Sequence, residues 1–179
     1  MDLTWAIKFF DTYWFMKHQN MDPLEDPEFI KMFTQKLTGE NLEEGAEALC
    51  ESLTILRGKL FPVIQDLQQG RFDEGETLKI LSEYIGRSKG IRKVLLEDTG
   101  EEMVPKLVFE PEKVDEAYVL SEFATMWYIL LFEKDRTRIH ICELPDCACL
   151  FIDESKNRSK RHCTEKCSNV MKMRRHRGK

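Results

Sequence analysis

Four cysteines near the C-terminal end of the chain have the spacing of a metal site. Four residues separate Cys142 from Cys147, three separate Cys163 from Cys167, and fifteen lie between the two pairs. Zinc binds four thiolates in a tetrahedron, and a short gap lets one tight turn present two sulfurs to the same ion. The sequence therefore predicts one structural Zn²⁺ ion held by these four cysteines.

Neighbouring residues leave alternatives for the ligand set. Cys149 follows Cys147 by two positions, so on a strand it would share the same face and could replace Cys147 as a ligand. His140 and His162 are also close in sequence. We expect packing or polar roles for both histidines, because four cysteines already complete the tetrahedron.

The compartment bears on what the cysteines do. The first twenty residues lack the pattern of a signal peptide, and no run of eighteen apolar residues is present. We therefore expect a cytoplasmic protein with no membrane partner. Thiols stay reduced there, so clustered cysteines favour metal over the alternative of disulfides or free thiol pairs.

The elements that must position the cysteines can be read from the residues between them. Pro145 and Asp146 favour a turn inside the first pair, and Thr164 can begin a helix that carries Cys167. Residues 148–162 have room for a hairpin with its turn near Glu154–Asn157. The result is a treble-clef-like zinc module at residues 138–179, which is too small to fold without its metal.

The rest of the chain, residues 1–137, predicts a helical domain. Asp26 can cap a helix that has Pro27 in its first turn and stops at Gly39. A long amphipathic helix with a bend or interruption near Pro62 follows from the leucine spacing. The expected helices span residues 2–18, 26–39, 43–69, 74–87 and 112–134; a β-hairpin is expected at 91–98 and 103–110, and a strand at 138–142. The fold class is therefore mainly α.

The chain is acidic overall, but its end is strongly basic. Residues 154–179 hold ten Lys or Arg and two Asp or Glu, whereas residues 1–153 hold seventeen basic and thirty acidic residues. A zinc-fixed basic helix is suited to phosphate contacts and to the major groove, so double-stranded DNA is the expected partner. The candidate nucleic-acid-binding residues are Arg158, Lys160, Arg161, Lys172, Arg174, Arg175 and Arg177.

Helical periodicity divides these cations. At about 100° per residue, Lys172 and Arg175 face away from the metal, whereas Arg174, Arg177 and Met173 lie nearer the core side. Those two arginines could instead pair with acids of the larger domain. In a second interpretation the whole basic end packs against its own acidic body, on residues such as Glu40, Glu43 and Glu44.

The cysteine segment resembles a known family, the CGNR zinc finger. The shared positions are Leu150, Phe151, Asp153, Ser155, Asn157, Arg158, Ser159, Arg161, Cys163, Cys167, Asn169, Lys172, Arg174, Arg175 and Arg177. Ser168 and Val170 replace the glycine and the arginine that help to name the family, and His162 stands where an aromatic is usual. The segments FFDTYW and LTILRGKL resemble the ABATE domain that precedes this finger. The resemblance implies a stress-induced bacterial transcription regulator.

Two classes of function compete on these grounds. In the first, the zinc module binds DNA, and the helical domain senses a small-molecule effector or forms a homodimer. In the second, the zinc module is a clasp in a protein-interaction module and binds no nucleic acid. RNA is less favoured, because the basic end has no aromatics for stacking. The chain lacks a Gly-rich phosphate loop, G-x-S-x-G and H-E-x-x-H, so no enzyme is predicted.

Arg57 is a charged residue within an otherwise apolar helical pattern. It is either solvated or salt-bridged, or it lines an anion-binding pocket with Trp5, Asp11 or Trp14. The sequence names no residues that would bind an effector.

Overall fold

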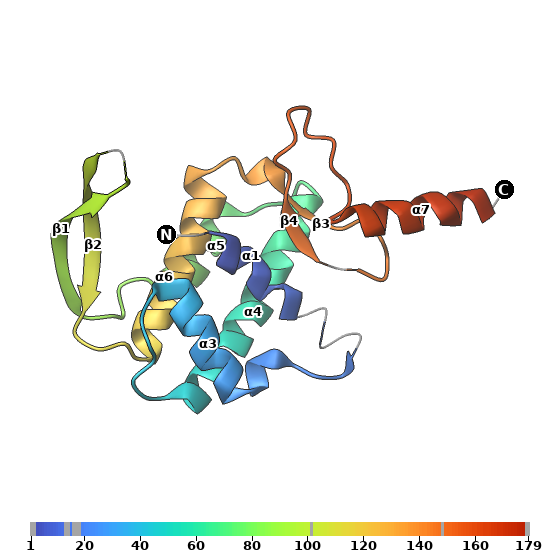
Figure 1. Ribbon diagram of the computed structural model, residues 1–179. Coiled ribbons are helices and arrows are strands. Elements are labelled where there is room, and N and C mark those ends of the chain that lie inside the picture. The colour runs from blue at the N-terminus through green and yellow to red at the C-terminus, as the bar shows by residue number, and fades with distance from the viewer. Residues whose placement is uncertain (1–2, 13–14, 16–18, 101, 148, 178–179) are drawn as a thin grey trace.

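A computed structural model describes residues 3–12, 15, 19–100, 102–147 and 149–177. It contains a helical body with a hairpin on one side and a C-terminal zinc module on the other (Figure 1). The mainly α fold class is confirmed. The body consists of α1 (Thr4–Phe9), η1 (Pro23–Glu25), α3 (Pro27–Thr38), α4 (Ala46–Gln68), α5 (Glu74–Ser82), α6 (Glu116–Tyr128), η2 (Ile129–Glu133) and η3 (Arg136–Arg138).

Local chemistry explains where α3 begins and ends. The Asp26 carboxylate accepts the backbone N–H of Glu28 at 2.9 Å, and Pro27 occupies the first helical position. At the other end Gly39 has a φ of 84°, in the left-handed region that glycine adopts without cost. The predicted boundaries of this helix are therefore confirmed.

Two other helical predictions are confirmed in part. Helix α4 continues from Ala46 to Gln68 with Pro62 inside it, so of the two alternatives, a bend or an interruption, the interruption is excluded. Within the range expected at residues 2–18, α1 covers Thr4–Phe9 and Asp11, Thr12 and Phe15 are also helical, whereas the contributions expected of Tyr13 and Trp14 lie outside the described residues.

Aromatic side chains from three helices form the centre of the body. The ring centroids of Phe9 and Phe123 lie 4.4 Å apart, those of Phe9 and Phe33 5.7 Å, and those of Phe10 and Trp127 5.1 Å. All five side chains are at most 2% exposed. Burial of these rings stabilises the packing of α1, α3 and α6.

The same core contains a buried ion pair. Nη1 of Arg57 donates to Oδ1 of Asp22 at 2.9 Å and to Oγ1 of Thr12 at 2.8 Å, and its Nη2 pairs with the other Asp22 oxygen. The Arg57 and Asp22 side chains are 5% and 7% exposed. The salt-bridged alternative for Arg57 is therefore the one observed, because the Asp22 carboxylate occupies the place of an external anion.

The hairpin and the zinc module leave the body in different directions. Strands β1 (Gly90–Asp98) and β2 (Met103–Pro111) pair antiparallel and project from the helical body (Figure 1). The zinc module contains β3 (Ile139–Ile141), β4 (Leu150–Ile152) and α7 (Glu165–Arg177). Within the described ranges, none of the helices combines the length and apolarity that a membrane crossing requires.

Candidate metal centre and nucleic-acid interface

Strand β3 leads directly to the first cysteine pair. Its residues pair with β4 from Ile139↔Ile152 to Ile141↔Leu150, and the Cys142 N–H continues the pairing by donating to the Cys149 carbonyl at 2.9 Å. The Cys147 N–H donates to the Leu144 carbonyl at 2.8 Å and closes a turn. This turn brings Cys147 back toward Cys142, as the residues between them predict.

The second pair is positioned by the start of α7. The Cys167 N–H donates to the Thr164 hydroxyl at 3.3 Å, and the Ser168 N–H donates to the Thr164 carbonyl at 3.2 Å. Cys163 lies just before the helix and Cys167 lies in its first turn. One turn of helix thus separates the two sulfurs and places them on the same side.

The four sulfurs meet in the arrangement that zinc requires. The Sγ atoms of Cys147, Cys163 and Cys167 lie 3.5, 3.6 and 3.7 Å from one another, and all four sulfurs including that of Cys142 lie within 4.8 Å. Sulfurs at about 2.3 Å from a central zinc would be about 3.8 Å apart in a tetrahedron. The residues present therefore fit one zinc ion with four thiolate ligands.

Burial affects the protonation of two of the four thiols. Burial raises the pKa of Cys147 and of Cys163, so each sulfur on its own would keep its proton at neutral pH. A divalent cation supplies the charge that stabilises closely spaced thiolates. Metal binding and proton release are therefore linked at this site.

The other candidate ligands lie outside the four-sulfur group. Cys149 is half-buried and is not one of the four clustered ligands, although its thiol hydrogen-bonds to Cys147 and Cys163 as well as to Asp11. The His140 ring lies 5.7 Å from that of Phe151, and Nε2 of His162 is buried with no hydrogen-bond partner among the described residues. Neither histidine belongs to the group of candidate metal ligands in the described part of the chain.

The loop between the cysteine pairs is organised by Asp153 rather than by a hairpin. The buried Asp153 carboxylate accepts the N–H of Ser155 at 2.8 Å and that of Lys160 at 3.0 Å. The only strand described within residues 149–162 is β4, and it pairs with β3 instead of with a later strand. The predicted hairpin is therefore wrong, because side-chain to backbone bonds close this loop in place of a strand ladder.

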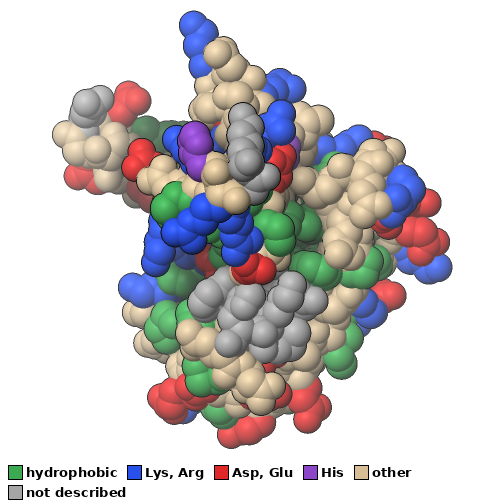
Figure 2. All heavy atoms as spheres, turned by 90° about the vertical axis from the view of Figure 1, so that its right-hand side faces the viewer, with side chains coloured by type: hydrophobic (Ala, Val, Ile, Leu, Met, Phe, Trp, Pro, Cys, Tyr) green, Lys and Arg blue, Asp and Glu red, His purple; other side chains and the backbone are tan. Residues whose placement is uncertain are grey.

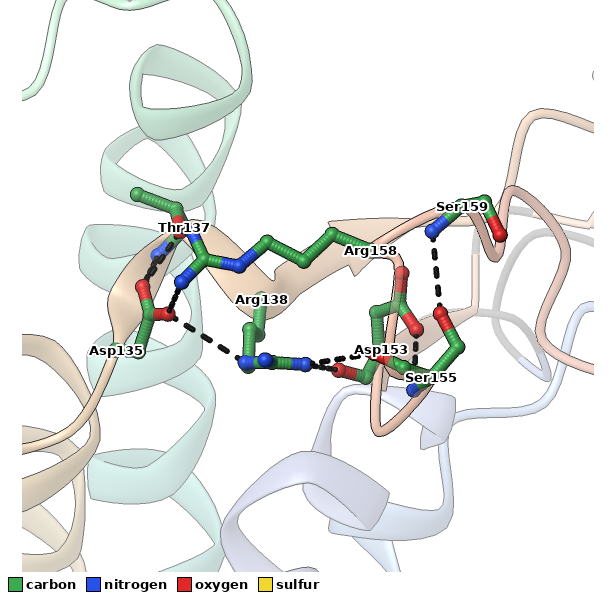
Figure 3. A network of polar contacts seen from close by, with 7 residues as sticks. All are labelled: Asp135, Thr137, Arg138, Asp153, Ser155, Arg158 and Ser159. Carbon is green, nitrogen blue, oxygen red and sulfur yellow. Dashed lines mark hydrogen bonds and ion pairs between the residues drawn. The ribbon is translucent and has the colours of Figure 1, made fainter.

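A polar network connects this loop to the end of the helical body (Figure 3). The Arg138 guanidinium donates to the carbonyls of Asp153 and Ser155 at 2.8 and 3.1 Å. The Arg158 guanidinium lies 2.7 Å from the Asp135 carboxylate and donates to the Thr137 hydroxyl at 3.2 Å. Arg158 also has a φ of 52°, in the left-handed region. Its backbone therefore forms part of the turn in the loop, and its side chain connects the loop to Asp135 and Thr137.

Two further candidate cations make ion pairs within the zinc module. Arg174 lies 2.5 Å from the carboxylate of Asp146, in the turn between the first two cysteines. Arg161 lies 3.7 Å from Glu143. Arg174 was expected to lie on the inner side of the helix, but its partner belongs to the cysteine turn and not to the helical body.

The remaining candidate cations are more open. Lys172, Arg175 and Arg177 are exposed, and none of them makes an ion pair among the described residues. The Lys160 ammonium lies 5.2 Å from the centre of the Phe151 ring. A groove of about 380 Å³ lies beside these residues; its lining is Ser159, Lys160, Arg161, His162, Thr164, Glu165, Ser168 and Arg175. We call it the basic groove.

The space-filling view toward the C-terminal end shows this distribution of charge (Figure 2). Lys and Arg side chains gather with His around the zinc module, whereas Asp and Glu side chains lie mainly along the lower and outer edges of the face. A polyanion approaching this face would therefore meet mostly positive charge.

The zinc module is also packed on the helical body. Ile139 and Leu150 belong to the main core, and the Gln68 side chain donates to the Ile139 carbonyl at 2.6 Å. Val170 and Met171 pack around the cysteines, but Met173 is 52% exposed. Met173 was expected on the core side; it is exposed because α7 extends away from the body beyond its first turns (Figure 1).

Sequence reasoning missed the partners that organise this region. Arg138, Asp135 and Glu143 fix the loop and its cations, yet each looks like an ordinary surface residue in the sequence. The signal that could have found them is the placement of opposite charges close to the ends of β3. Their actual partners are up to about twenty positions away along the chain and become neighbours only on folding.

Comparison with known proteins supports the metal site. Residues 138–179 match the family model described as CGNR zinc finger. The match does not reach the helical body, for which the ABATE resemblance stays a prediction. No curated protein gives a significant match. The family match and the four converging sulfurs together identify residues 138–179 as a CGNR-type zinc module that binds one structural zinc ion.

Proposed function

We propose that the zinc module binds double-stranded DNA through the basic groove and the outer face of α7, and that the protein acts as a transcription regulator. The observation that carries the proposal is that four of the seven candidate cations pair with no described acid: Lys160, Lys172, Arg175 and Arg177. Zinc fixes these side chains on a rigid helix and loop. Cations fixed in this way can replace the counterions of DNA phosphates.

The ion-paired arginines have a different part in this proposal. Arg158, Arg161 and Arg174 hold the loop, the turn and the helix in place through Asp135, Glu143 and Asp146. They position the open cations and need not contact phosphate themselves. The proposed interface is therefore smaller than the set of basic residues in the sequence indicates.

The acids that could cover the interface lie elsewhere. Glu43 accepts the Val114 N–H at 3.1 Å, and Glu44 lies 3.2 Å from Lys113, at the end of the body near α6. These contacts leave the basic groove open and favour the DNA-binding proposal over a basic end folded on its own acidic body.

One observation favours the second candidate, a structural clasp. Ile139 and Leu150 are part of the main core, so the zinc module stabilises the helical body whether or not it binds DNA. The clasp and the DNA-binding surface use different faces of the module. A clasp alone would leave the open cations of α7 without a function.

The test is the affinity of zinc-loaded protein for a labelled random DNA duplex, measured by fluorescence anisotropy at about 50 mM salt. The double variant Lys172→Ala/Arg175→Ala removes two proposed phosphate contacts and should weaken binding by an order of magnitude or more. The matched control, Lys36→Ala/Lys89→Ala, removes two exposed lysines of the body and should leave affinity unchanged. Equal affinity for the two double variants would assign binding to another surface, and no binding by the wild type would favour the clasp.

A further inference from the structure

The hairpin has two faces of different character. Its register is regular from Gly90↔Pro111 to Asp98↔Met103, so residues that pair across the strands share a face and alternate along each strand. One face carries two diagonal ion pairs, Lys93 with Glu110 and Lys106 with Glu97, the second at 2.7 Å. Charged pairs of this kind are typical of a sheet face in contact with water. The same face also carries four apolar residues, of which Ile91 and Leu95 are 56% and 52% exposed.

The opposite face is apolar and uncovered. Its central residues are Val94, Leu96, Met103, Pro105 and Leu107, which we call the apolar face. Val94, Leu96 and Leu107 are 67%, 64% and 60% exposed. Contiguous exposed apolar surface is costly in water and commonly marks a contact with another molecule, and a two-stranded hairpin on its own is only marginally stable.

The base of the hairpin is anchored so that this face turns toward the body across a groove. The Phe109 ring, on the same face, stacks on Tyr118 of α6 with centroids 6.2 Å apart. Beyond this contact a groove of about 450 Å³ separates the hairpin from α6, with Arg92, Leu107 and Glu122 among its lining residues. An occupant of the groove would contact the apolar face and the helix at the same time.

The order of residues along β1 indicates what the occupant is. On the apolar side β1 presents Arg92, Val94, Leu96 and Asp98 in sequence. If a second copy of this strand lies antiparallel against the first, Arg92 faces Asp98 of the other copy, and Val94 faces Leu96. The charge of Arg92 also acts on Glu122 of its own chain. Between two copies of β1, however, the charges match when the strands run in opposite directions, which is an arrangement that a twofold axis gives.

We propose that the apolar face binds the apolar face of a second copy of this chain, with the tip of each hairpin at the groove of the other copy, where Arg92 lies. The groove has room for a few side chains of that tip. A face of nine residues and two strands measures about 30 by 10 Å, so two such faces alone remove about 600 Å². That is about half of what a stable interface buries, and the wall formed by Tyr118 and Glu122 supplies further contact.

This interface is independent of the proposed DNA binding, because the hairpin and α7 lie on opposite sides of the body (Figure 1). The test is therefore the mass of the full-length, zinc-loaded protein by sedimentation equilibrium. A dimer is expected. Val94→Glu/Leu107→Glu should raise its dissociation constant at least a hundredfold, because it places four carboxylates in an apolar contact. The matched control, Leu95→Glu, adds a carboxylate to the charged face, where Leu95 is 52% exposed, and should leave the dimer intact.

Charge reversal tests the antiparallel arrangement itself. Arg92→Asp and Asp98→Arg should each weaken the dimer by roughly tenfold, because each creates two like-charge contacts by symmetry. The combination Arg92→Asp/Asp98→Arg should restore the dimer. Circular dichroism checks that all variants fold. A monomeric wild type, or a dimer that survives Val94→Glu/Leu107→Glu, would overturn the proposal, and a double reversal without rescue would exclude the antiparallel register.

Discussion

Removing the charge of Asp22 should destabilise the helical body far more than removing the charge of an exposed aspartate. The variant Asp22→Asn keeps an oxygen that can accept the Leu24 N–H, which donates to Asp22 at 3.1 Å. It leaves the Arg57 guanidinium buried without a compensating carboxylate. The change therefore isolates the effect of one buried charge from the loss of a turn hydrogen bond.

The expected magnitude follows from burial. Both side chains of the pair are less than a tenth exposed, and loss of one partner from a buried ion pair costs about 3 to 5 kcal/mol. The matched control is Asp66→Asn, whose pair with Arg71 is 2.6 Å long with side chains 43% and 62% exposed. An exposed pair of this kind contributes about 0 to 1 kcal/mol.

Urea unfolding of the zinc-loaded protein, followed by far-ultraviolet circular dichroism, measures the loss of unfolding free energy in Asp22→Asn and in Asp66→Asn at neutral pH. Asp22→Asn/Arg57→Met should recover most of the stability, because it leaves no unpaired buried charge. If Asp22→Asn and Asp66→Asn lose the same free energy of unfolding, the reasoning from burial is refuted.

The same pair predicts a dependence on pH. Burial would raise the pKa of Asp22, but hydrogen bonds from Arg57 and the Leu24 N–H and the charge of Arg57 outweigh burial and lower the pKa below its ordinary 3.8. The stability that the carboxylate contributes is therefore present above about pH 4 and lost as pH falls. The difference in the free energy of unfolding between the wild type and Asp22→Asn should therefore become smaller below pH 4.

Three further predictions concern the zinc site, the hairpin and Asp11. Cys147→Ser should reduce the zinc content measured by mass spectrometry to well below one ion per chain, whereas Cys149→Ser should keep one ion; the opposite result would exchange the two cysteines as ligands. Gly90→Ala should loosen the hairpin and increase hydrogen exchange along β1, because a Cβ there would lie 2.6 Å from the Phe109 ring and 2.2 Å from the Glu110 carbonyl oxygen; unchanged exchange would refute this packing. Burial raises the pKa of Asp11 to about 6, despite the Cys149 hydrogen bond and the charge of Lys8, so the stability that protonated Asp11 contributes is lost as pH rises from 4 through 6. Asp11→Asn should therefore stabilise the protein at pH 7 by about 1 to 2 kcal/mol, after allowance for solvent screening, and should have little effect at pH 4; the same gain at both values would contradict the assignment.

Local chemistry made much of the fold predictable. Helix α3 begins and ends at residues with strong local preferences, namely Asp26 and Pro27 at its start and Gly39 at its end. The two short apolar runs on either side of the turn at residues 98–102 indicate the hairpin. The four metal ligands could be predicted equally well from the sequence, because zinc requires a donor type and a spacing that few other arrangements satisfy.

Pairing between distant residues was not predictable in the same way. Arg57 and Asp22 are 35 positions apart, and the sequence offered several possible neighbours for the arginine. Arg158, Arg161 and Arg174 appear alike as members of a basic segment, yet folding places a carboxylate beside each of them. Charge counts along the chain therefore overestimate how many cations remain open to a ligand.

The exposure of α7 was a second limit of sequence reasoning. Helical periodicity assigned Met173 to a core face, but periodicity does not reveal whether a core is present beside that part of the helix. Only the first turns of α7, with Val170 and Met171, pack against the cysteines.

The salt dependence of DNA binding tests the central claim most directly. Four open cations, Lys160, Lys172, Arg175 and Arg177, would release about four counterions and give a slope of about −3.6 in a plot of log affinity against log salt. Raising salt from about 50 to about 200 mM should then weaken binding of the zinc-loaded protein to a random duplex by about 150-fold. No binding at 50 mM, or a loss of less than tenfold across this range, would contradict the account of the zinc module as a surface for DNA phosphates.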